Sequence, residues 1–133
     1  MNKAQAASQR RLRLRGLLDE MGRWTSVVQG RDPLLAGSLY ERRRRCGKAR
    51  CRCASGRLHG SLALSVSRQG RSRLIPLAGL DPSQLSRYSL ADRHVREARQ
   101  KMQSLCHSLL QEAERLHRLR RVNPEQLRQV LPA

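Results

Sequence analysis

Three of the four cysteines in this chain lie within a short segment, and a histidine follows closely. They are Cys46, Cys51 and Cys53, with His59 completing the pattern C-x4-C-x-C-x5-H. Thiolate sulfur and imidazole nitrogen are ligands that tetrahedral zinc prefers, and four of them close its coordination sphere. The sequence therefore predicts a structural zinc site. This site constrains the fold strongly, because residues 46–59 must wrap around one point.

The residues between the cysteines suit a tight loop. We expect Gly47, Gly56 and Gly60 to supply backbone with positive φ. Neighbouring cations should lower the thiol pKa values and partly balance the thiolate charge. These cations are Lys48, Arg50, Arg52 and Arg57. Two alternatives stay open: three unligated thiols in a basic loop, and a redox or nucleophilic centre. The metal is favoured because soft ligands rarely cluster so tightly without a use.

The charge balance points to a polyanionic partner. Lysine and arginine total 28 against 10 acidic residues, which gives a net charge of +18. We expect nucleic acid, with double-stranded DNA favoured. Phenylalanine is absent and other aromatic residues are few, so phosphate and base-edge contacts should dominate over stacking. The predicted contact residues are Arg42, Arg43, Arg44, Arg45, Lys48, Arg50, Arg52, Arg57, Arg68, Arg71 and Arg73. A merely solvated basic surface is the competing interpretation.

Hydrophobic periodicity predicts an α+β fold with a helix near each end of the chain. Residues 3–28 form the first helix, with the arginines of its other face solvated. A second helical segment begins at an Asp81 cap, kinks near residues 89–92 and runs to about residue 121. Its heptad-like seam, interrupted by Glu112, should pack on the first helix as an antiparallel pair, with Cys106 as a core thiol. A homodimeric coiled coil is the competing use.

Strands are predicted between the two helices. Residues 38–42 form a short strand, and residues 62–67 and 73–77 form a basic hairpin around a turn at residues 68–71. The hairpin could enter a DNA major groove, or its charges could simply protect a sheet edge. We expect a single domain, built from an N-terminal helix (1–30), a knuckle with hairpin (37–79), a helical segment (81–121) and a short terminal helix (123–133).

The cysteine core resembles that of a known family. The matching residues are Gly37-Ser38, Arg45-Cys46-Gly47-Lys48, Cys51, Cys53-Ala54, Gly56 and His59-Gly60. They fit the pattern G-S…R-C-G-K-x-x-C-x-C-A-x-G-x-x-H-G-P of a bacterial and archaeal family of unknown function. The resemblance covers about residues 37–115 and leaves the N-terminal helix outside. Ser61 stands in place of the family's proline, and residues 62–64 replace a tyrosine-rich strand.

Members of that family often occur beside transposase, integrase and phage genes. The resemblance therefore implies an accessory or regulatory role at a mobile element, with a transposase or recombinase as a further partner. A protein–protein adaptor that docks or dimerises through the helical seam is the alternative function. We expect no enzyme activity, because the acidic residues do not cluster as metal-dependent phosphodiester cleavage would need. Neither a secretory signal nor a membrane span is predicted, and clustered thiols suggest the reducing cytoplasm.

Overall fold

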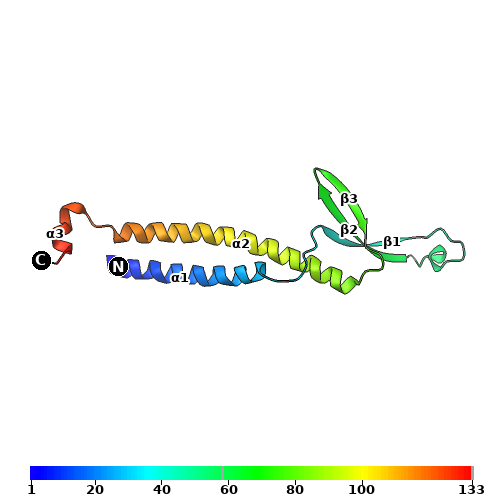
Figure 1. The fold of residues 1–133 in the computed structure, drawn as a ribbon, viewed down its shortest axis with the longest axis horizontal. Coiled ribbons are helices and arrows are strands. Elements are labelled where there is room, and N and C mark those ends of the chain that lie inside the picture. Colours follow the sequence, from blue (N-terminus) through cyan, green and yellow to red (C-terminus); the bar gives the residue numbers. More distant parts are fainter. Residues whose placement is uncertain (58, 133) are drawn as a thin grey trace. The chain divides into compact units, whose positions relative to one another are not determined.

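The computed structural model describes residues 1–57 and 59–132, and for residue 59 only the backbone. Helices and a three-stranded antiparallel sheet confirm the predicted α+β class (Figure 1). The elements are α1 (Lys3–Val28), β1 (Ser38–Arg44), the 3-10 helix η1 (Arg52–Ser55), β2 (His59–Arg68), β3 (Arg71–Pro76), α2 (Pro82–Arg120), η2 (Pro124–Gln126) and α3 (Leu127–Val130). The chain forms two compact units, Met1–Gly30 with Glu97–Ala133 and Arg31–Arg96.

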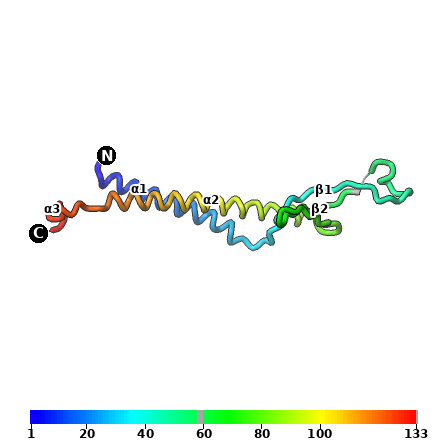
Figure 2. The backbone as a smooth tube through the Cα atoms, turned by 90° about the horizontal axis from the view of Figure 1, so that it is seen from above, coloured from blue at the N-terminus to red at the C-terminus, as the bar shows by residue number. Residues whose placement is uncertain are grey.

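The first unit pairs α1 with the second half of α2 (Figure 1 and Figure 2). The α1 helix begins at a capping box in which Asn2 and Gln5 each bond the other's backbone. Lys3 Nζ donates a 2.9 Å hydrogen bond to the carbonyl of Arg121, so the start of α1 lies at the end of α2. The predicted antiparallel pairing of the two helices is confirmed.

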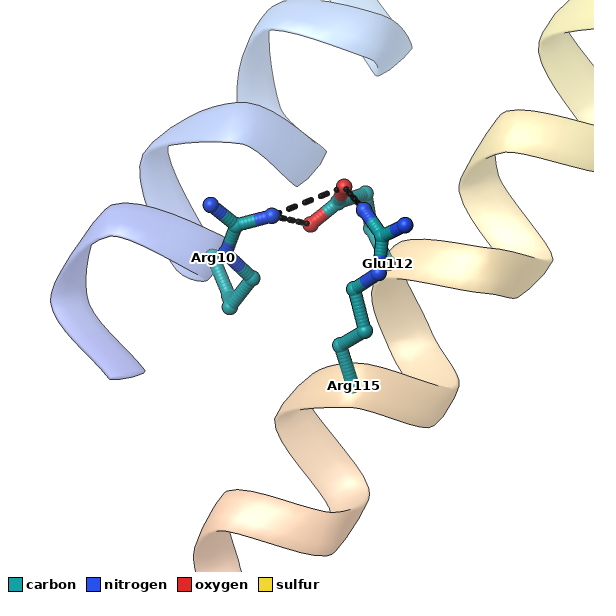
Figure 3. Close-up of polar contacts among 3 residues, drawn as sticks. All are labelled: Arg10, Glu112 and Arg115. Carbon is teal, nitrogen blue, oxygen red and sulfur yellow. Dashed lines mark hydrogen bonds and ion pairs between the residues drawn. The ribbon is translucent and has the colours of Figure 1, made fainter. Parts of the chain in front are cut away.

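The seam between these helices is narrow and follows the heptad spacing. Ala7 and Leu17 of α1 are buried, and so are Ala98 and Leu105 of α2. Glu112 falls on the same spacing and is also buried, so it belongs to the seam and does not interrupt it. Its carboxylate accepts hydrogen bonds from Arg10 and from Arg115 (Figure 3). Arg10 is therefore partly withdrawn from the solvated face expected for it.

Two other expectations about α2 are wrong. The helix is continuous from Pro82 to Arg120, with no break at residues 89–92. Asp92, the last residue of the expected kink, instead accepts a 2.9 Å hydrogen bond from Nε of Arg96 within the helix. Cys106 is exposed, because it lies one position beyond Leu105 and is turned out of the seam. Asp81 does cap the helix, accepting a hydrogen bond from the Ser83 backbone N–H.

The second unit contains the sheet, in the order β1-β2-β3. The hairpin turn is confirmed: Arg68 pairs with Arg71, and Gln69 and Gly70 both have positive φ, as a two-residue type I′ turn requires. Ala63, Leu64 and Leu85 are buried in this unit. Strands β1 and β2 extend further than expected, to Arg44 and from His59, and so reach the cysteine loop.

Gly60 does not have the positive φ that we expected. It lies in β2 opposite Arg43, in extended backbone. A Cβ atom at Gly60 would come within 2.7 Å of Oε1 of Glu41. The absence of a side chain there makes room for this carboxylate, and does not serve a left-handed turn.

Among the described residues, neither long helix has a stretch apolar enough to cross a membrane.

Candidate metal centre

The three clustered cysteines converge in space. The Sγ atoms of Cys46, Cys51 and Cys53 all lie within 4.8 Å of one another. The Sγ atoms of Cys46 and Cys53 are 3.4 Å apart. Thiolates that bind one tetrahedral zinc at about 2.3 Å stand about 3.8 Å apart, which lies inside this range. The arrangement fits a metal ion that takes three sulfur ligands.

Local backbone structure brings the thiols together. Strand β1 ends at Arg44, two residues before Cys46, and Gly47 then turns the chain with a φ of 85°. The backbone N–H of Cys51 bonds the carbonyl of Lys48 at 3.1 Å and closes this turn. Helix η1 follows and carries Cys53. Gly56 ends η1 in the left-handed conformation, with a φ of 104°. The predicted positive φ is therefore confirmed at Gly47 and Gly56.

Backbone amides face the sulfur atoms. The N–H of Cys46 donates to Sγ of Cys53 at 3.2 Å, and this bond, with those from the neighbouring thiols, lowers the pKa of Cys53. The Lys48 backbone also favours the thiolate of Cys46, but hydrogen bonds with Cys53 and Cys51 outweigh it and raise the pKa of Cys46. The Cys53 thiol therefore loses its proton before the Cys46 thiol does, as expected of neighbouring groups that share protons. A cation would replace the shared protons.

Burial differs among the three ligands. Cys53 is only 1% exposed, Cys51 is half-buried and Cys46 is exposed. The cluster therefore opens to solvent on the side of Cys46. This is the side from which a metal ion, or a fourth ligand, would enter.

The fourth predicted ligand is His59, whose side chain lies outside the described residues. Its backbone pairs with Arg44 at the end of the β1–β2 ladder, close in sequence to Cys46. Cys106 belongs to the helical unit and is not among the three clustered cysteines. The assignment of His59 stays a prediction.

The predicted nucleic-acid contact residues fall into two groups. Those in the cysteine loop are all exposed around the cluster; they are Arg45, Lys48, Arg50, Arg52 and Arg57. Those in the strands are divided by the pleat, because neighbouring residues on a strand point to opposite faces. Arg42 and Arg44 lie on one face of the sheet. The other face carries Arg43, Arg68, Arg71 and Arg73.

A surface cavity lies beside the cysteines. It has a volume of about 530 Å³ and is lined by Arg44, Arg45, Cys46 and Ser61. Ser61 was not among the predicted site residues. Alternation along β2 could have placed it on a polar face, but only the β1–β2 register shows that it lies opposite Arg42.

Comparison with known proteins identifies a family. A family model described as a domain of unknown function (DUF6788) matches residues 6–75, more than half of the chain. The matched segment includes α1, which the resemblance had placed outside the family, and ends before α2. It contains the whole cysteine cluster. No curated protein and no solved structure matches the chain.

Proposed function

The chain belongs to the DUF6788 family of domains of unknown function, and we propose from its own chemistry that it binds double-stranded DNA through a basic segment stapled by zinc. The site would act in binding and not in catalysis. Three thiolates and one imidazole fill a tetrahedral ion and leave no open position for substrate, as in structural zinc sites.

The observation that carries this proposal is the charge around the cluster. Between Arg42 and Arg73 the sequence has eleven lysines and arginines and no aspartate or glutamate. A zinc ion with three thiolates and a neutral histidine contributes a single negative charge, so the segment stays strongly positive. So many like charges held in a short strand-and-loop structure repel one another. A polyanion such as DNA relieves that repulsion and releases its own counterions.

The metal has a mechanical role in this proposal. The loop from Arg45 to Arg57 contains no strand and only one turn of 3-10 helix, and its single buried residue is Cys53. A loop with so little apolar burial gains little order from packing. A bound ion supplies that order and holds the loop arginines at fixed positions beside β1 and β2.

The test is the salt dependence of binding. Fluorescence anisotropy with a labelled 25-base-pair duplex would give affinities between 50 and 200 mM salt. If about five cations contact phosphates, this fourfold change in salt should weaken binding several hundredfold. Protein stripped of metal by a chelator should bind more weakly than the same protein reloaded with zinc. An affinity indifferent to salt would overturn the proposal.

A specific observation favours a second candidate, the protein–protein adaptor. Leu12, Leu18 and Leu110 of the helical unit are 58–71% exposed. Exposed apolar surface marks a protein contact site where it forms a contiguous patch. A docked protein, such as a recombinase encoded at a mobile element, would cover them. The two functions are compatible, since they use different units of the chain. A mass in solution that rises with concentration, without affinity for DNA, would favour the adaptor alone.

A further inference from the structure

The β1–β2–β3 register gives the sheet two chemically different faces. One face carries Leu39, Leu64 and Ile75 in a single cross-strand row. The next rows on that face add Leu62 opposite Glu41 and Val66 opposite Arg73. Leu64 is buried, and Leu39, Leu62, Val66 and Ile75 are half-buried. We call this the leucine face.

One of the four cations of the leucine face, Arg43, is engaged by a carboxylate. Nε of Arg43 lies 3.6 Å from Oε1 of Glu41, the one carboxylate in β1. That carboxylate also lies over Gly60, on the same side of the ladder. A phosphate approaching Arg43 would meet Glu41 as well, and like charges repel. At its β1 end, the leucine face therefore suits packing within the protein better than binding to a polyanion.

The opposite face carries no carboxylate and is largely polar, apart from the buried Ala63 of β2 and Leu74 and Pro76 of β3. Its β1 residues are Ser38, Tyr40, Arg42 and Arg44. Strands β2 and β3 add the hydroxyl groups of Ser61, Ser65, Ser67 and Ser72. We call this the serine face. Every one of these polar side chains except Arg42, Ser61 and Ser65 is exposed, and those three are half-buried.

The serine face leads directly into the metal centre. Arg44 and Ser61 line the cavity that also contains Cys46 and Arg45. A group held in this cavity would touch two guanidinium groups and one hydroxyl next to the metal ligand. Phosphate oxygens are the natural occupants, because guanidinium forks bind them in a bidentate way and hydroxyls donate to them.

We infer that the serine face binds the phosphodiester backbone of nucleic acid, with one phosphate in the cavity bounded by Arg44, Arg45 and Ser61. Arg42 and Arg44 supply positive charge along β1. The hydroxyl groups of Tyr40, Ser65, Ser67 and Ser72 supply neutral hydrogen-bond donors across the three strands. Hydroxyl and guanidinium contacts to phosphate fix position without reading sequence. The inference rests on the proposed function and selects the surface that performs it.

Neighbouring arginines on β1 give a matched test. Arg43 and Arg44 are both exposed and carry the same charge, but they point to opposite faces. We expect Arg42→Ala with Arg44→Ala to weaken duplex binding about sixtyfold at 0.1 M salt, and to reduce the salt slope by about two, since each lost contact removes about 0.9. Arg43→Ala with Arg73→Ala, the control pair on the leucine face, should change affinity less than about threefold and leave the slope unchanged.

A variant that should gain affinity distinguishes a direct effect on DNA binding from a loss of the fold. Ser67→Lys adds a cation at an exposed position of the serine face, and should raise the salt slope by about one. Circular dichroism and metal content would be measured for every variant. Equal effects of the two arginine pairs, or a larger effect of Arg43 and Arg73, would overturn the inference while DNA binding stands. A wild-type protein without salt-sensitive affinity for duplex DNA would overturn both the inference and the proposed function.

Discussion

Arg10 reaches across the helix pair and donates to both carboxylate oxygens of Glu112, at 3.0 and 2.9 Å (Figure 3). Glu112 is only 5% exposed, and Arg115 donates to it from one turn further along α2 at 2.7 Å. A buried polar pair in a heptad seam fixes register, because a shift by one heptad would leave the charge without its partner. In a parallel homodimer through α2, Glu112 would face a second Glu112. The pair therefore favours the intramolecular arrangement.

Removing one member of this pair should destabilise the helical unit. We expect Arg10→Leu to lower the free energy of unfolding by about 1–3 kcal/mol, because Glu112 keeps only Arg115 as a partner. This range is below that of a fully buried ion pair, since the Arg10 side chain is 30% exposed. Urea denaturation would measure the change.

The double variant is the control for this interpretation. Arg10→Leu with Glu112→Leu leaves no unpaired charge and should recover most of the lost stability. Without the polar pair, the seam no longer excludes other pairings, so the variant should show dimers in sedimentation equilibrium. A double variant that is as unstable as the single one, and strictly monomeric, would contradict a register role.

The apolar seam gives a second prediction with a control on the same helix. Leu17 is 2% exposed and Leu12 is 67% exposed, both on α1. Leu17→Ala should lower the free energy of unfolding by about 2–5 kcal/mol, because it leaves a cavity against α2. Leu12→Ala should stay within about 0.5 kcal/mol of the parent protein. Equal effects would mean that α1 does not pack in the register described.

The bounds of α1 and the hairpin turn followed from sequence because they depend on local signals. Spacing of apolar residues predicted the helix over residues 3–28, and the glycine at position 70 predicted the turn at residues 68–71. The convergence of Cys46, Cys51 and Cys53 also followed, since a short segment can bring three ligands together only in a tight loop.

The errors concern residues whose role is decided by distant segments. Arg10 looks solvated until Glu112, on the far helix, is placed beside it. Cys106 looks apolar enough for the core, yet it lies one position from Leu105, and a rotation of 100° per residue turns it outward. Gly60 suggests a turn, and only the pairing of β1 with β2 shows that Glu41 occupies its missing side-chain volume. The division of arginines between two faces likewise needed the register.

Glycines at two positions should respond to alanine in opposite directions. Gly37 has a φ of 118°, and a Cβ atom there would lie 2.7 Å from the backbone oxygen of Ser65. Gly37→Ala should therefore destabilise the sheet unit by about 1–3 kcal/mol. Gly16 lies inside α1 with nothing within 4 Å of its Cβ position, so Gly16→Ala should stabilise the helical unit by about 0.5–1 kcal/mol. Thermal denaturation would measure both, and a stabilising Gly37→Ala would contradict the described approach of the chain to β2.

The link between Asp32 and Arg87 should make the sheet unit sensitive to acid. Arg87 donates to both Asp32 oxygens, at 2.6 and 3.2 Å, and this hydrogen bonding lowers the pKa of Asp32. A lowered folded pKa stabilises the protein above the ordinary aspartate pKa, near 4, and this stabilisation disappears as the pH falls through the lowered value. The difference in stability between the wild type and Asp32→Asn should therefore shrink from pH 6 to pH 2. A difference that is constant with pH would contradict the contact.

Elemental analysis should find one zinc per chain in protein purified without added metal. Cys46→Ser, Cys51→Ser and Cys53→Ser should each release it, because three sulfurs within 4.8 Å of one another make a single site that no two of them can complete. Cys106→Ser is the matched control: it removes a thiol from exposed helix surface in the other unit, and should retain the metal. Lowering the pH should release zinc as protons compete for the thiolates.

The prediction about His59 is tested in the same way, with His59→Ala expected to weaken zinc binding at least tenfold if its imidazole is the fourth ligand. Less than about a tenth of an equivalent of any transition metal in the wild type would exclude the site. The three thiols would then be a reduced cluster in a basic loop, and the order of that loop would have to come from the polyanion itself.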